Sequence, residues 1–79
     1  MIAEERVQLA IAVYDATMAS TESFEAEDHI GADVAYLMGA ILKEDRFDAW
    51  SRNRELLRIL RENFPPDHEL WKFINIREK

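Results

Sequence analysis

Three side chains in the sequence are spaced so that they could bind a divalent cation. Glu25, His29 and Asp33 follow one another at intervals of four residues, which places them on one face of a helix. One helix, however, rarely supplies enough well-placed ligands for tight metal binding. Pairing of the histidine with the two carboxylates on a solvated helix face explains the same spacing. We therefore predict no metal site and no cofactor.

The side chains that could catalyse a reaction form no recognisable site. Arg61 and His68 flank Pro65-Pro66, and some ribonucleases built on helical hairpins use an arginine and a histidine near a helix start, but the spacing here is loose. The serines lie in a polar break or on an expected helix surface; they are Ser20, Ser23 and Ser51. The sequence has neither a Gly-x-Ser-x-Gly elbow nor a glycine-rich phosphate-binding loop. We predict that the chain is not an enzyme.

Acidic residues are concentrated in the first half of the chain. Residues 1–45 carry ten acids and two bases, and residues 46–79 carry eight bases and six acids, so that the halves have net charges of −8 and +2. An acidic half repels phosphates, which argues against direct binding to nucleic acid and favours a basic surface on a protein partner. The expected partner-binding residues are Glu22, Glu25, Glu27, Asp28 and Asp33. The alternative is that these acids form an ordinary helix N-terminus and only increase solubility.

The basic site that such a protein covers would commonly be one that binds nucleic acid, with carboxylates lying where phosphates would lie. Small acidic helical inhibitors such as the immunity proteins of nuclease bacteriocins act in this general way, and phage-encoded inhibitors of bacterial machinery are often of this size and charge. The analogy is one of size and charge, because none of their motifs occurs here. The first hypothesis is therefore a small acidic regulatory or inhibitory protein of bacterial or phage type.

Three arginines, Arg54, Arg58 and Arg61, line one edge of the apolar stripe of an expected helix. Such a ridge could bind an anion or RNA. The simpler interpretation is that the arginines pair with the acids of residues 22–33, within the chain or across a dimer, while their alkyl stems cover the core.

Two apolar groups lie on the expected first helix, turned roughly 150° from each other. One consists of Ile2, Leu9, Val13 and Ala16, and the other of Val7, Ile11, Tyr14 and Met18. A chain of 79 residues has little mass to surround a helix that is apolar on two sides. We therefore predict a homodimer whose contact includes Leu9, Val13, Tyr14 and Met18. The alternative function is a self-associating structural or assembly module without an inhibitory role.

The apolar periodicity predicts an all-α fold in a single domain, residues 1–79. We expect a small antiparallel bundle of three main helices, at residues 2–19, 24–43 and 46–64, with a short C-terminal helix at residues 67–76. Asp45 and Asp67 are the expected N-caps, and Pro65-Pro66 ends the third helix.

Single residues inside the expected helices add detail to this fold. Gly31, Ala35 and Gly39 lie beside the apolar stripe of the second helix, and such small side chains let another backbone approach closely. Asn53 lies within the apolar stripe of the third helix, where a buried asparagine needs partners. Ile59 points away from that stripe and is expected on the surface.

The overall composition limits the cellular location. The chain has no cysteine, which excludes disulfides and cysteine-based zinc or redox sites. The N-terminus is acidic, unlike a secretory signal, and no apolar run approaches the roughly 18 residues that span a bilayer. We expect a cytoplasmic protein that does not bind membranes.

Overall fold

The computed structural model describes residues 3–20 and 28–77, which fold mostly into helices. In chain order the elements are α1 (Glu4–Ser20), α2 (Asp28–Lys43), β1 (Phe47–Ala49), the 3₁₀ helix η1 (Ser51–Asn53), α3 (Arg54–Asn63), the 3₁₀ helix η2 (Glu69–Phe73) and β2 (Ile74–Ile76). The prediction was an all-α bundle. The described chain is indeed mostly helical, but it also contains a small parallel sheet that was not expected.

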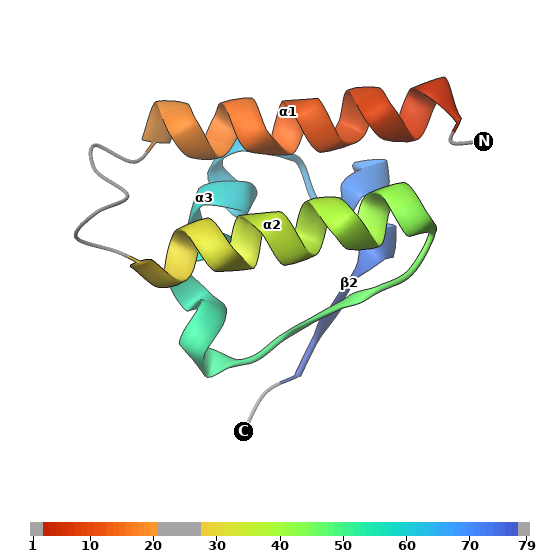
Figure 1. Ribbon diagram of the computed structural model, residues 1–79. Coiled ribbons are helices and arrows are strands. Elements are labelled where there is room, and N and C mark those ends of the chain that lie inside the picture. Colours follow the sequence, from red (N-terminus) through yellow and green to blue (C-terminus); the bar gives the residue numbers. More distant parts are fainter. Residues whose placement is uncertain (1–2, 21–27, 78–79) are drawn as a thin grey trace.

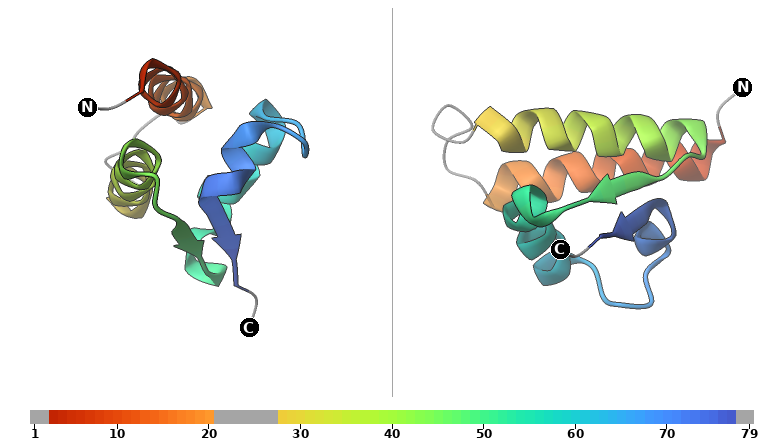
Figure 2. Two further views of the ribbon diagram at one scale, coloured as in Figure 1. Left: turned by 90° about the vertical axis from the view of Figure 1, so that its right-hand side faces the viewer. Right: turned by 90° about the horizontal axis from the view of Figure 1, so that it is seen from below.

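The elements form two layers (Figures 1 and 2). The first layer contains α1 and α2, which lie side by side. We count Glu44 and Asp45, which follow α2, as part of this layer. The second layer, residues 46–77, contains the two strands, α3 and both 3₁₀ helices. Apolar side chains from both layers meet in one core, in which Val13, Leu37 and Leu60 are fully buried.

The two long helices begin and end for local reasons. Glu4 and Glu5 lie in the first turn of α1, where the helix dipole favours negative charge. At the C-terminus of α2, Glu44 takes the left-handed conformation, with φ of 58°, and Asp45 N–H donates to the Ala40 carbonyl at 2.8 Å. These features form the usual closure of a helix C-terminus, here without a glycine, and α2 therefore ends at Lys43.

The predicted helix at residues 46–64 is wrong in its first half. Residues 47–49 form β1, which pairs in parallel with β2, with Phe47 opposite Ile74 and Ala49 opposite Ile76. Each strand alternates apolar, polar and apolar residues, so that the apolar residues share one face of the sheet, from which Ala49 and Ile74 are buried in the core. Asp45 caps no helix, because its Oδ1 accepts from the N–H of the next residue, Arg46.

The predicted C-terminal helix at residues 67–76 is also replaced. Its first part is the five-residue 3₁₀ helix η2 and its last part is β2. The capping residue is His68 and not Asp67, since His68 Nδ1 accepts from Leu70 N–H at 3.0 Å. Leu70 is fully buried and holds this segment on the core.

Two of the single-residue predictions have different outcomes. Asn53 is buried, as expected, with 2% of its surface exposed. Ile59 was expected on the surface but is fully buried. The buried arc of α3 is broad: Leu56 and Leu60 lie at its centre, and Ile59 and Leu57 lie at its two edges.

Candidate functional site

The predicted acidic site lies only partly within the described residues. Glu22, Glu25 and Glu27 fall outside them, and Asp28 is the first residue of α2. Asp33 is held by the fold, because its Oδ2 accepts from Asn53 Nδ2 at 2.6 Å. The structure thus ties one of the five residues to the second layer.

The residues considered as metal ligands, Glu25, His29 and Asp33, lie only partly within the described part of the chain. Glu25 lies outside it, and Asp33 is engaged by Asn53. Across residues 3–20 and 28–77, no three histidine or acidic side chains are close enough to share an ion.

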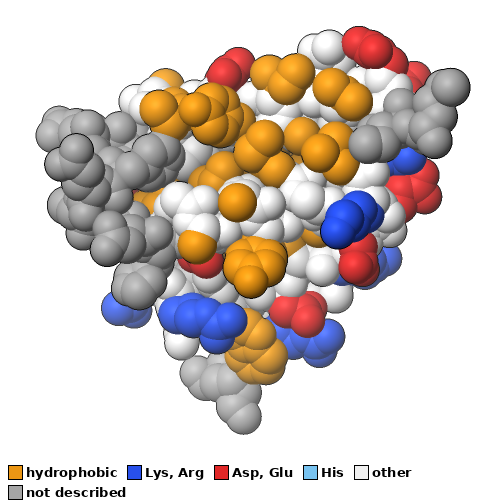
Figure 3. Space-filling model, in the orientation of Figure 1, with side chains coloured by type: hydrophobic (Ala, Val, Ile, Leu, Met, Phe, Trp, Pro, Cys, Tyr) orange, Lys and Arg blue, Asp and Glu red, His pale blue; other side chains and the backbone are white. Residues whose placement is uncertain are grey.

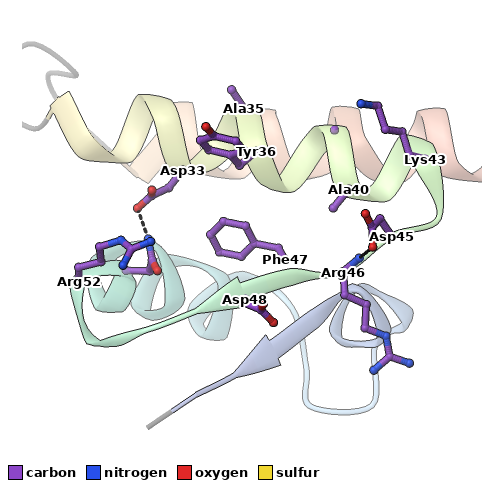
Figure 4. A pocket seen from close by; sticks show the side chains of 12 residues that line it. Asp33, Ala35, Tyr36, Ala40, Lys43, Asp45, Arg46, Phe47, Asp48 and Arg52 are labelled. Atoms are coloured by element: carbon purple, nitrogen blue, oxygen red, sulfur yellow. Dashed lines mark hydrogen bonds between the residues drawn. The ribbon is translucent and has the colours of Figure 1, made fainter. Parts of the chain in front are cut away.

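A groove of about 640 Å³ separates α2 from β1 and η1 (Figure 4). The Phe47 ring points into it from β1, and Tyr36 of α2, 73% exposed, lies on its rim. Lys43 and Arg46 point away from the groove in opposite directions (Figure 4). The described lining has no histidine, cysteine or serine, and its ionisable side chains are three aspartates, two arginines, a lysine and a tyrosine.

The acids that line this groove already have partners. Asp33 accepts from Asn53, and Asp45 accepts from the Arg46 N–H. Asp48 Oδ1 accepts from Asn75 Nδ2 at 3.2 Å and from Arg77 Nε at 3.3 Å. These bonds position the strands and helices around the groove, and they give no pair of carboxylates in contrasting environments for acid–base catalysis.

Every ion pair among the described residues stays within one layer. In the first layer, Arg6 pairs with Glu44. In the second layer, Arg58 pairs with Glu55 and Glu62 of its own helix, and Arg77 pairs with Asp48. Apart from the bond between the chain neighbours Asp45 and Arg46, side-chain hydrogen bonds between the layers come, in the described ranges, from two asparagines: Asn53 to Asp33 and Asn63 to Ser20.

Within the described residues, the arginine ridge (Arg54, Arg58 and Arg61) forms no ion pair with an acid of the second helix. Arg58 is engaged by acids of α3, and Asp33 is engaged by an asparagine. The Arg58 guanidinium donates hydrogen bonds to Glu55 and lowers the pKa of that carboxyl, and Glu55 in turn raises the pKa of Arg58. The other predicted partners of these arginines, the acids of residues 22–27, are outside the described residues.

The predicted self-association residues separate into two groups. Leu9 and Val13 are buried in the core of the chain itself, which corrects their assignment to a dimer contact. Tyr14 and Met18 are 46% and 43% exposed, and Ile11, at 44%, lies on the same side of α1. Apolar side chains gather over α1 and α2 on this face of the molecule (Figure 3).

The glycines of α2 open onto space and not onto another helix. A Cβ added at Gly31 or Gly39 would meet no described atom within 4 Å. Close packing against the described part of the chain therefore does not explain these glycines, contrary to the steric argument from the sequence.

The residues considered for catalysis have structural roles or lie apart. His68 caps η2, and its ring lies 4.9 Å from the Phe64 ring in an edge-to-face arrangement. Arg61 is exposed on α3, Ser20 accepts from Asn63, and Ser51 begins η1. Sequence reasoning also missed Thr17, which is fully buried and donates its hydroxyl to the Val13 carbonyl at 2.8 Å.

Two further results bear on identity. In the part of the chain that the structure describes, no helix combines the length and apolar character needed to cross a bilayer. Comparison with known proteins gives no match: no family model, no curated protein sequence and no solved structure is significantly similar to this chain.

Proposed function

We propose that this chain is a small, non-catalytic regulatory or inhibitory protein of the cytoplasm that binds a basic surface on a protein partner through its acidic first layer. The observation that carries the proposal is the absence, among the described residues, of any ion pair between the two layers. The charge asymmetry of the sequence is thus not cancelled at those positions by the fold.

The described part of the first layer has a clear excess of negative charge. Residues 3–20 and 28–45 contain seven acids and two bases, and one of the bases, Arg6, already pairs with Glu44. A negative surface of this kind speeds association with a positive one and excludes like-charged partners. A partner site that normally binds nucleic acid has the complementary charge.

Charge reversal tests this proposal. The partner is first identified by pull-down from the host lysate with mass spectrometry, and its affinity is then measured for a triple variant, Glu25→Lys, Glu27→Lys and Asp28→Lys. We expect affinity to fall at least about tenfold, because the electrostatic attraction changes sign. The helical circular dichroism signal should be retained.

The matched control reverses the same number of acids in the second layer: Glu62→Lys, Asp67→Lys and Glu69→Lys. All three acids are exposed. We expect this variant to bind within about twofold of the wild type. Equal losses in the two triple variants would contradict a role specific to the acidic first half of the sequence, and unchanged affinity of the first variant would refute the proposal.

A second candidate function is a homodimeric assembly module. It is favoured by the exposed side chains Ile11, Tyr14 and Met18, which follow a helical spacing on one face of α1. Light scattering at a protein concentration of about tens of micromolar should show a dimer. Tyr14→Glu should convert this dimer into a monomer, because it places a charge in the contact. Asp15→Asn, next to it in sequence, is the control. A monomeric wild type would exclude this function.

A further inference from the structure

Two cavities adjoin each other in the second layer, on the side of α3. The first, of about 300 Å³, is bordered by Trp50, by Arg54 and Arg61 of α3, and by Arg77 after β2. The second, of about 400 Å³, is bordered by Phe64, Pro66 and Trp71. Arg61 and Ile76 border both cavities, so the two form one continuous surface.

The first cavity has positive charge and, among the residues that border it, no carboxylate. Its three arginines are Arg54, Arg61 and Arg77. Arg54 and Arg61 are seven residues apart, two turns along one face of α3. Arg77 donates to Asp48 through Nε, which leaves its two Nη groups without a hydrogen-bond partner in the described part of the chain. Of the three, Arg77 pairs with Asp48, whereas Arg54 and Arg61 have no ion pair among the described residues of a chain whose net charge is −6.

The second cavity is mostly apolar, and one of the side chains that border it, Trp71, is fixed by a hydrogen bond. Trp71 Nε1 donates to the Pro65 carbonyl at 2.9 Å, which fixes the indole beside Pro66. Phe64 is buried under this surface, and Ile76 is 42% exposed at its border with the first cavity. A large apolar side chain from a ligand would gain contact area here while its neighbouring anionic groups reached the arginines.

We propose that the two cavities form a docking site for an acidic segment of a partner protein, with carboxylates on Arg54, Arg61 and Arg77 and one large apolar side chain against Trp71 and Ile76. Guanidinium groups bind carboxylates through paired hydrogen bonds, which gives this site its selectivity. The site does not depend on the acidic first layer, and it takes a ligand of the opposite charge.

Acids beside the apolar cavity argue for a peptide and against nucleic acid. Asp67 and Glu69 are exposed in the segment between Pro66 and Trp71. A nucleic acid has a negative charge at every nucleotide and would be repelled there. A peptide avoids this repulsion, because its apolar residue lies at that end and its carboxylates lie at the other.

Tryptophan fluorescence provides a direct test. Trp50 and Trp71 are the only tryptophans of the chain, and one borders each cavity. The probe is an acetylated hexapeptide of five glutamates and a terminal phenylalanine, which does not fluoresce on excitation of tryptophan. We expect a saturable change in emission with the full chain. The same hexapeptide with a terminal serine should bind at least about fivefold more weakly, because it lacks the apolar contact.

Neutral variants assign the binding to the arginines. The double variant Arg54→Gln and Arg61→Gln should weaken binding of the glutamate–phenylalanine peptide at least about tenfold, whereas Arg52→Gln, an exposed arginine on the other groove, should change it less than about twofold. Equal effects of the two variants, or no saturable change with the wild type, would overturn the proposal. Tighter binding of a thymidine hexanucleotide than of the peptide would also overturn it, and would assign the site to nucleic acid.

Discussion

Asn53 joins three parts of the chain through one side chain. Its Oδ1 accepts from the Trp50 N–H at 2.9 Å, where β1 has ended, and its Nδ2 donates to Asp33 of α2. The residue itself lies at the junction of η1 and α3. A buried amide with both ends satisfied fixes the place at which the extended chain turns into a helix, and so it fixes where Arg54 begins α3.

Replacement of this amide should be costly. Asn53→Ala leaves the Trp50 N–H without its acceptor and removes a hydrogen bond to a carboxylate, so we expect the free energy of unfolding to fall by about 2–4 kcal/mol. Urea denaturation measures the change. Asn63→Ala is the matched control, because Asn63 is exposed, and it should cost less than about 1 kcal/mol. Similar losses in both variants would contradict the role given to Asn53.

The Glu55–Arg58 pair makes a prediction about pH. Hydrogen bonds from Arg58 hold the pKa of Glu55 below its ordinary value. A carboxyl with a lower pKa in the folded state stabilises the fold above its unfolded-state pKa, and this contribution is lost as the pH falls through the folded-state value. In the Arg58→Gln variant, the pKa of Glu55 should rise towards the ordinary value, as followed by NMR titration of the carboxyl carbon. The control, Arg52→Gln, should leave the pKa of Glu55 unchanged. If Arg58→Gln also left it unchanged, the pairing of Glu55 with Arg58 would be refuted.

At the scale of elements, the paired strands set the arrangement of the second layer. Ile74 and Ile76 lie on the same strand, but Ile74 is 7% exposed and Ile76 is 42% exposed. We expect Ile74→Ala to lower the free energy of unfolding by about 2–4 kcal/mol, since it leaves a cavity in the core. Ile76→Ala, the matched control, should cost about 1 kcal/mol or less. Urea denaturation compares the two, and a reversed order would contradict the position of β2 on the core.

The sequence predicted the long helices better than the short elements, for a physical reason. The helix expected at residues 2–19 corresponds to α1, because seventeen residues without glycine or proline carry a strong local signal. A three-residue strand carries almost none. Phe47-Asp48-Ala49 and Ile74-Asn75-Ile76 show matching apolar–polar–apolar triplets, but the pairing that makes them strands joins residues 27 apart in sequence.

The candidate sites were predictable to the same limited extent. The uneven charge and the exposure of Tyr14 and Met18 follow from composition and helical spacing. The burial of Leu9 and Val13 within the chain depends on the second layer, whose shape the sequence did not reveal. Likewise, Arg77 and Trp50 reach the same cavity as Arg54 and Arg61 only because β2 pairs with β1.

At the scale of the whole molecule, charge is divided between the two layers. The first layer is acidic, and the second contains the cavity bordered by arginines. The contact between the layers is made by apolar side chains and asparagines in the described ranges, so the opposite charges stay at the surface. Such a molecule can present surfaces of opposite sign to two partners, or to two regions of one partner.

This division of charge determines how salt changes the stability of a variant that lacks one acid. If the acids of the first layer mainly repel one another, removal of one of them should stabilise the fold when screening is weak. Asp15 is an exposed acid in the middle of α1. At about 0.01 M salt we expect Asp15→Asn to raise the free energy of unfolding by roughly 0.3 kcal/mol, and at about 1 M salt, where the Debye length is about 3 Å, the gain should disappear.

The control for this effect lies in the other layer. Asp67 is exposed in the second layer, where bases outnumber acids, so Asp67→Asn should give no gain at low salt. Urea denaturation of both variants and the wild type at the two salt concentrations measures the difference. A loss of stability for Asp15→Asn at low salt would mean that cations of the second layer neutralise the first layer across the fold. The negative charge would then be unavailable to a basic partner, and the proposed function would lose its physical basis.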